Sequence, residues 1–186
     1  MADDSPHTRA LPGDADAATP ALSRMLRINH AGEYGAKRIY TGQMAVLRGH
    51  PLQAELEHMA AQEQVHLDAF NRILPEHGVR PSALMPLWHV GGYMLGAATA
   101  LLGERAAMAC TVAVETVITE HYDSQLAQPE VTGPALHATI QRFRDEEMEH
   151  HDIGLKHAAE AAPLYPVLSE MIKAGCKAAI WLAGRF

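Results

Sequence analysis

Two copies of a Glu-x-x-His pattern, Glu63/His66 and Glu147/His150, interrupt apolar stripes that predict α-helices. Residues three apart lie on one face of a helix, so each pair directs a carboxylate and an imidazole toward the same point, where they can hold a metal ion. The spacing alone is weak evidence, because 14 Glu and 12 His in 186 residues give roughly 0.9 such patterns by chance.

A third copy of the pattern is Glu55/His58, so the surrounding sequence must decide which copies are candidate metal ligands. Apolar residues at steps of three and four place Glu63 and His66 on the buried stripe of their helix, whereas the third copy falls off that stripe. The copy at residues 147–150 repeats the buried arrangement. A buried carboxylate or imidazole without a partner costs several kcal/mol, so these groups must satisfy one another or bind a cation.

Two further carboxylates are predicted to face the core. Glu33 lies on an apolar repeat with seven-residue steps, and Glu115 lies within the almost wholly apolar segment 110–118. Glu33 is followed 30 residues later by Glu63, and Glu115 is followed 32 residues later by Glu147. The sequence therefore predicts two helical hairpins with the same layout of ligands.

The length of each helix supports this layout. At 1.5 Å per residue, Glu33 lies about 24 Å and Glu63 about 17 Å from a turn near residues 49–51, whereas Glu55 lies only about 6 Å from it. Four carboxylates and two imidazoles can therefore converge. This is the known ligand set of di-iron and di-manganese centres in ferritin-like bundles. Hard oxygen ligands with two imidazoles suit iron or manganese better than structural zinc.

Length and composition favour a single all-α domain. The chain has 186 residues, of which 48% are hydrophobic and only 5% aromatic, as suits Ala, Leu and Met packing between helices. We expect a disordered tail at residues 1–21 and, at 22–186, a ferritin-like four-helix bundle with an additional helix, partly facing a membrane. Proline positions and apolar periodicity predict helices over about 22–49, 51–77, 86–127, 130–161 and 166–184.

Charge and cysteine content narrow the function class. The formal net charge is −7 and no basic cluster is present, so we expect no nucleic-acid binding. The start lacks a basic region followed by an apolar region, which argues against a secretory signal. The two cysteines, Cys110 and Cys176, offer no disulfide framework and favour a reducing compartment.

A segment without Asp, Glu, Lys or Arg covers residues 81–103. It reaches the length of a transmembrane candidate, but Pro86 and three glycines interrupt it. We favour an interfacial helix whose outer face meets lipid over a helix buried by protein alone or a spanning helix. The final segment, residues 171–182, mixes lysines, Ile and Trp, either as a second interfacial anchor or as a capping helix packed on the bundle.

The remaining histidines and the helical glycines have structural interpretations. Four histidines in tails, turns or helix starts are expected to be surface groups: His7, His50, His77 and His137. Three others flank the site helices and are candidates for bonding the outer nitrogens of the ligand imidazoles: His30, His151 and His157. Five glycines are expected to permit close helix packing and not phosphate binding: Gly42, Gly91, Gly92, Gly96 and Gly103.

Four segments carry a resemblance to a known family. They are residues 29–36 (Asn-His-Ala-Gly-Glu-Tyr-Gly-Ala), 112–115 (Val-Ala-Val-Glu), 146–152 (Glu-Glu-Met-Glu-His-His-Asp) and 174–182 (Ala-Gly-Cys-Lys-Ala-Ala-Ile-Trp-Leu). Together they resemble the demethoxyubiquinone hydroxylase family of ubiquinone biosynthesis, over about residues 23–186. The resemblance implies a membrane-associated di-iron monooxygenase that hydroxylates the ring of a polyprenylated demethoxyubiquinol with O2 and two electrons, with NADH as an electron source.

The resemblance also implies roles for single residues. The terminal ligands would be Glu33 and His66 on one iron and Glu115 and His150 on the other, with Glu63 and Glu147 bridging the two irons. Tyr122 matches a tyrosine proposed in the family to relay electrons or protons, and the alternative is an ordinary core tyrosine. His121 also matches the family, whereas Glu120 stands where animal members have a histidine. This departure leaves the ligands unchanged and concerns only contacts around them.

Location and partners follow from the same resemblance. It implies a peripheral protein on the cytoplasmic side of the cell membrane, or on the matrix side of the mitochondrial inner membrane in a eukaryote. Other ubiquinone-biosynthesis proteins are candidate partners, and the oligomeric state stays open. The alternative functions are a ferritin-like iron-storing or peroxide-reducing protein, another di-iron oxidase of a lipid-soluble substrate, and a helical scaffold whose carboxylates pair with Arg or Lys.

Overall fold

The structure is a computed structural model that describes residues 18–186. Within that range the regular elements are all helical, which confirms the all-α prediction. In chain order they are α1 (Pro20–Val46), α2 (Gln53–Glu76), α3 (Met85–Leu101), α4 (Glu104–Leu126), α5 (Pro129–Lys156), the 3-10 helix η1 (Ala159–Ala161) and α6 (Tyr165–Ala183).

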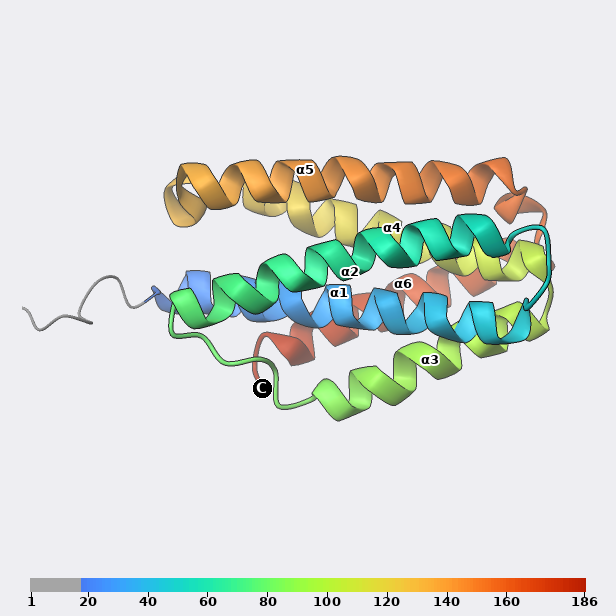
Figure 1. Cartoon of the computed structure of the whole chain (residues 1–186), viewed down its shortest axis with the longest axis horizontal. Helices are drawn as coiled ribbons and strands as arrows, with labels where there is room; N and C mark the ends of the chain where they lie inside the picture. The colour runs from blue at the N-terminus through green and yellow to red at the C-terminus, as the bar shows by residue number, and fades with distance from the viewer. Residues whose placement is uncertain (1–17) are drawn as a thin grey trace, which may run out of the picture.

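Two helical hairpins form the bundle (Figure 1). Helices α1 and α2 pack against each other, as do α4 and α5, and this confirms the two predicted hairpins. Two further helices lie outside the four: α3 packs against α1, and α6 packs against α4. Within the described residues, α2 contacts neither α3 nor α6. The bundle therefore has a side formed by α2 and α5 and another side formed by α3 and α6.

One predicted helix is wrong. The segment 86–127 forms two helices, α3 and α4, because Gly103 between them has φ 105°, a conformation that side-chain-bearing residues rarely adopt. The expectation that Gly103 permits helix packing is therefore also wrong. The segment 130–161 likewise divides into α5 and η1. Helix α1 begins at Pro20, two residues before its predicted start, and residues 1–17 of the predicted tail lie outside the described residues.

Helices α1 and α3 approach so closely that side chains are excluded at their crossing. A Cβ added to Gly96 would lie 1.9 Å from the carbonyl oxygen of Ile39, and one added to Gly42 would lie 2.2 Å from that of Tyr93. Gly92 also meets the backbone of α1. The prediction of close packing is thus confirmed for these three glycines.

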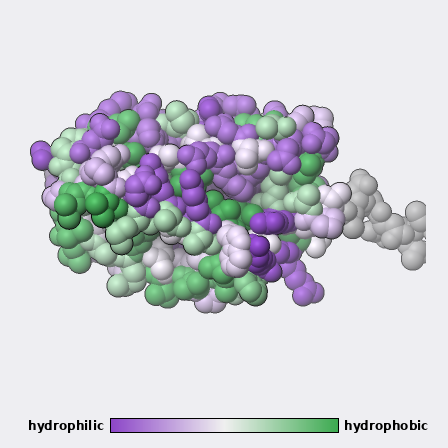
Figure 2. Space-filling view, turned by 180° about the vertical axis from the view of Figure 1, so that it is seen from behind, coloured by the Kyte–Doolittle hydropathy of each residue, from purple (hydrophilic) through white to green (hydrophobic). Residues whose placement is uncertain are grey.

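Much of the apolar surface of α3 and α6 is left uncovered. Figure 2 shows hydrophobic residues gathered over the lower half of the molecule and hydrophilic ones over the upper half. Only three residues of α3 are buried, so the interpretation that protein alone buries the charge-free segment is wrong. Within residues 18–186, the helices all fall short of the length and apolarity needed to cross a membrane. The large exposed side chains on these two helices include Leu87, Val90, Met94, Leu101, Val167, Met171 and Trp181.

The close approach of α1 and α3 predicts different effects for two glycines of α3. Gly96→Ala should lower the free energy of unfolding by about 1–3 kcal/mol, because the new methyl group meets backbone that has to shift. Gly91→Ala is the matched control, since its Cβ would have no atom within 4 Å, and this also makes the packing prediction for Gly91 wrong. Equal losses for the two variants in denaturant-induced unfolding would contradict the packing argument.

Candidate metal centre

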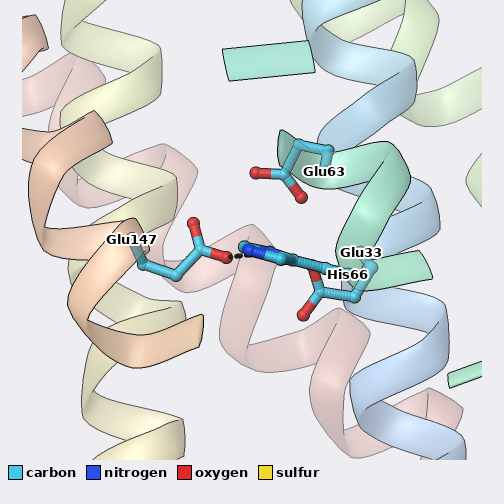
Figure 3. A group of neighbouring side chains, drawn as sticks. All are labelled: Glu33, Glu63, His66 and Glu147. Carbon is cyan, nitrogen blue, oxygen red and sulfur yellow. Dashed lines mark hydrogen bonds and ion pairs between the residues drawn. The ribbon is translucent and has the colours of Figure 1, made fainter. Parts of the chain in front are cut away.

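The six predicted ligand residues lie together in the core. Each is almost inaccessible to water, with an exposed fraction of 0–1%. They are Glu33 from α1, Glu63 and His66 from α2, Glu115 from α4, and Glu147 and His150 from α5. Figure 3 shows four of them, from three helices, directed toward one another.

Two overlapping groups have the spacing that a metal ion requires. In each group the ligand atoms all lie within 4.8 Å of one another. The groups are Glu33, Glu63, His66 and Glu147, and Glu63, Glu115, Glu147 and His150. Glu63 and Glu147 belong to both groups, which is the placement expected of bridging ligands. The structure thus brings the predicted ligands together, and metal binding by them stays a prediction.

The third Glu-x-x-His copy, Glu55/His58, lies on the surface. This was predicted, because neither residue falls on the apolar stripe of its helix. The Glu55 side chain is 40% exposed and faces His157, and the His58 side chain is 52% exposed and faces Glu149. Neither belongs to the two groups. The apolar context therefore separated the buried copies from the exposed one.

Both imidazoles direct Nδ1 into the centre. Nδ1 of His66 lies 3.2 Å from Oε2 of Glu33 and 3.1 Å from Oε1 of Glu147. Nδ1 of His150 lies 3.1 Å from Oε2 of Glu147 and 3.3 Å from Oε1 of Glu63. A divalent cation among these carboxylates would therefore meet Nδ1 of each ring.

Two tyrosines donate hydrogen bonds to carboxylates of the centre. Tyr40 on α1 donates to Oε1 of Glu115 on α4 at 2.6 Å, and Tyr122 on α4 donates to Oε1 of Glu33 on α1. Burial, followed by the nearby carboxylates, raises the pKa of both phenols well above the usual value, so they remain donors. Tyr122 was predicted near the site. Tyr40 was not, although it follows Glu33 by the same seven residues that separate Tyr122 from Glu115.

The outer nitrogens of the imidazoles bond two residues that the sequence did not reveal. Nε2 of His66 lies 2.5 Å from Oε2 of Glu146, and Nε2 of His150 lies 2.9 Å from Oε1 of Gln62. The three histidines proposed for this role have other partners: His30 bonds Asn71, His151 bonds Asp152 and His157 bonds Glu104.

Charge is distributed unequally among the buried groups. Burial lowers the pKa of His66, but hydrogen bonds with Glu147 and Glu33 outweigh this effect and raise the pKa to about 12. Burial raises the pKa of Glu147, but its bonds to His150 and His66 outweigh burial and lower that pKa to about 2. Burial and then neighbouring carboxylates raise the pKa of Glu63 well above its usual value. A metal ion must therefore displace protons to enter the centre.

Unsatisfied oxygen atoms show that the donor set fits cations. Among the described residues, neither carboxylate oxygen of Glu63 nor Oε2 of Glu115 accepts a hydrogen bond, although Nδ1 of His150 lies 3.3 Å from Oε1 of Glu63. Buried oxygens without donors are costly, and a metal ion is the partner that would satisfy them. Four carboxylates with two neutral imidazoles would balance the charge of two divalent cations. Carboxylate-rich sets of this kind suit iron or manganese.

An apolar cavity of about 530 Å³ lies between α1, α3, α4 and α6. None of the described residues that line it is charged. Its wall includes Gly32 and Val114, which immediately precede Glu33 and Glu115. Cys176, one of two free cysteines, also lines the cavity, and burial and then the charge of Glu115 raise the pKa of its thiol to about 11. The wall of the cavity thus includes the chain neighbours of two candidate ligands, while the six candidate ligands themselves are not among its lining residues.

Comparison with known proteins identifies relatives over almost the whole described chain. The family model described as "Ubiquinone biosynthesis protein COQ7" matches residues 20–183. The chain is 52% identical over 170 residues to the NADPH-dependent 3-demethoxyubiquinone 3-hydroxylase, mitochondrial, of Mus musculus, covering 89% of this chain and 78% of that protein.

A bacterial and a fungal relative agree with this match. The chain is 52% identical over 176 residues to the 3-demethoxyubiquinol 3-hydroxylase of Rhodospirillum rubrum, covering 94% of this chain and 82% of the relative. It is 43% identical over 188 residues to the 5-demethoxyubiquinone hydroxylase, mitochondrial, of Saccharomyces cerevisiae, covering 92% and 81%. The predicted resemblance is confirmed, and the chain belongs to the ubiquinone biosynthesis protein COQ7 family.

Proposed function

We propose that this chain is a 3-demethoxyubiquinol 3-hydroxylase, a di-iron monooxygenase acting on the ring of a polyprenylated quinol. The observation that carries the proposal is the buried cluster of four carboxylates and two imidazoles, together with an uncharged cavity whose wall includes the residues preceding Glu33 and Glu115. The names of the relatives supply the reaction class. An iron-storing or peroxide-reducing protein would need the carboxylates but would have no use for the cavity.

The residues of the centre would hold two irons. Glu33 and His66 would bind one iron and Glu115 and His150 the other, with Glu63 and Glu147 between them. When bound, the two irons supply the redox chemistry by which one oxygen atom of O2 enters a ring C–H bond and the other leaves as water, with two electrons and two protons consumed. Tyr40 and Tyr122 orient the carboxylates that they bond. A relay role for Tyr122 remains part of the proposal.

The cavity suits the substrate class. Its apolar walls exclude water and would receive the quinol ring beside the carboxylates, while leaving a prenyl tail among apolar side chains. The predicted electron source was NADH, whereas the name of the mouse relative specifies NADPH. We therefore propose a reduced nicotinamide dinucleotide as the source of electrons.

The exposed face of α3 and α6 supports attachment to a membrane surface. A polyprenylated substrate stays in the bilayer, so the mouth of the cavity must meet the lipid. Exposed residues at its rim, Leu87 on α3 and Met171 on α6, are 52% and 69% exposed. The mouse and yeast relatives carry "mitochondrial" in their names. We propose a peripheral location for this chain, with other proteins of ubiquinone biosynthesis as partners.

Iron content should distinguish two glutamates of α2. Glu63→Ala is expected to reduce bound iron from about two per chain to one or none, because Glu63 belongs to both ligand groups. Glu55→Ala is the matched control from the exposed Glu-x-x-His copy and should retain two. Iron would be measured by elemental analysis after anaerobic loading and desalting. Loss of iron from both variants, or from neither, would refute the assigned ligand set.

The reaction is tested by product analysis with labelled oxygen. The iron-loaded chain, given ¹⁸O2, a reductant and a demethoxyubiquinol with a short prenyl tail, should yield a hydroxylated ring carrying one ¹⁸O atom, detected by mass spectrometry. Glu63→Ala should yield less than about 1% of that product if both irons are required. Consumption of peroxide or deposition of iron mineral without a hydroxylated ring would favour the alternative functions.

Binding to lipid should depend on valines of α3 and α6. The double variant Val90→Glu/Val167→Glu should bind phosphatidylcholine vesicles at least about tenfold more weakly, since burying a valine side chain stabilises binding by roughly 1.5 kcal/mol. The control is Val65→Glu on α2, because Val65 is 54% exposed, against 59% and 57% for the two test residues. Co-sedimentation that fell equally in test and control would argue against this face.

A further inference from the structure

The candidate centre repeats across an approximate twofold axis, both in sequence and in contacts. Each half contributes a glutamate followed seven residues later by a tyrosine: Glu33 and Tyr40 on α1, and Glu115 and Tyr122 on α4. Each tyrosine donates to the glutamate of the other half. Each half also contributes one Glu-x-x-His pair, on α2 or on α5.

The outer hydrogen bonds of the imidazoles also cross between the halves. His66 on α2 bonds Glu146 on α5, and His150 on α5 bonds Gln62 on α2. Glu146 and Gln62 occupy the same place in the repeat, because each immediately precedes the glutamate of its Glu-x-x-His pair. The two halves therefore differ at this position, where one has a carboxylate and the other a neutral amide.

The difference between Glu146 and Gln62 affects how strongly Nδ1 of each imidazole can bind a metal ion. An imidazole that donates its Nε2 hydrogen to a carboxylate is held in the tautomer that leaves Nδ1 free to bind a metal, and its Nδ1 becomes a stronger donor of electrons. A charge-assisted bond to a carboxylate is stronger than a bond to an amide, so the bond from His66 to Glu146 should hold its ring more firmly than the bond from His150 to Gln62 holds its own. Phe143 also stacks on the His66 ring, with centroids 4.0 Å apart, and restrains its plane.

The surroundings of Glu146 allow it to remain a charged carboxylate while it accepts a hydrogen bond from His66. Its side chain is 30% exposed, so the carboxylate keeps contact with water and carries a smaller desolvation cost than the ligands do. Its other oxygen lies 4.0 Å from Nε of Arg142, one turn earlier on α5. One oxygen therefore bonds a fully buried imidazole while the other faces a cation at the surface.

We infer that Glu146 is a positioning residue that makes the two metal positions unequal, so that the position containing His66 binds a divalent cation more tightly than the position containing His150. The inference rests on the proposed two-metal centre. Partners of this kind change metal affinity by roughly 10–100-fold. Since the ligand types repeat in the two halves, we assign the difference in affinity to the carboxylate of Glu146, which stands where the other half has the amide of Gln62.

The test is an anaerobic titration of the metal-free full chain with Fe(II), in which the heat of binding is measured by calorimetry. The wild-type chain should show two distinct dissociation constants. Glu146→Gln should raise the lower constant about 10–100-fold and change the other less than about threefold. Gln62→Glu should tighten the weaker position by a similar factor. Mössbauer spectra of samples loaded with one equivalent of ⁵⁷Fe should show one dominant doublet for wild type and two for Glu146→Gln.

Glu149→Gln provides the matched control. Glu149 lies on the same helix, is 54% exposed and faces His58 instead of a ligand, so both constants should stay unchanged. Thermal unfolding of each metal-free variant separates a loss of affinity from a loss of folding. If Glu146→Gln leaves both constants unchanged, or weakens both equally, the positioning role is refuted while the two-metal centre stands. A wild-type chain that binds fewer than two metals would overturn the proposed centre and this inference together.

Discussion

Six ionisable side chains meet at the centre of the bundle without access to water, and the rest of the structure depends on their need for charge balance. Four are carboxylates and two are imidazoles, each 0–1% exposed. Among the described residues, no Lys or Arg forms an ion pair with any of the six, which removes the support for a scaffold held by buried salt bridges. Two divalent cations would balance four carboxylates, and such a pair of cations needs ligands from all four helices at one level.

The centre divides the molecule into two chemically different sides. On the side of α2 and α5, polar groups such as Gln62 and Glu146 continue from the imidazoles toward the surface. On the side of α3 and α6 lie an uncharged cavity, whose wall includes the residues preceding Glu33 and Glu115, and an exposed apolar surface (Figure 2). In the proposed function, a lipid-soluble ring would approach the centre from the apolar side and a metal ion from the polar side.

The sequence predicted the elements that depend on helical periodicity. Glu33 and Glu115 could be placed because each is a charge within an apolar repeat, and Glu63 could be separated from Glu55 by the same criterion. Residues that act between helices were missed. Glu146 falls outside the buried stripe of its own helix, and its bond to His66 depends on the distance between α5 and α2, which periodicity does not give.

Backbone conformation also limits what the sequence predicts about the fold. The sequence predicts Gly103 as a packing residue inside one long helix, but its positive φ divides α3 from α4. A glycine inside a helix that allows close packing and a glycine with positive φ that ends a helix look the same within an apolar sequence. Only the backbone conformation, in which other residues would be strained, distinguishes them. The break has a structural consequence, because α4 returns to the bundle core while α3 lies outside it against α1.

The repeat also shows where asymmetry must originate. Hydroxylation treats the two oxygen atoms of O2 differently, yet the carboxylates, imidazoles and tyrosines of the two halves match one another. The wall of the cavity contains a neighbour of a carboxylate from each half, namely the residue before Glu33 and the residue before Glu115. A difference within the hydrogen-bonded centre lies on the side of α2 and α5, where Glu146 faces one imidazole and Gln62 the other. If the centre binds two metals, a carboxylate in place of an amide would make the two positions of this repeated arrangement unequal.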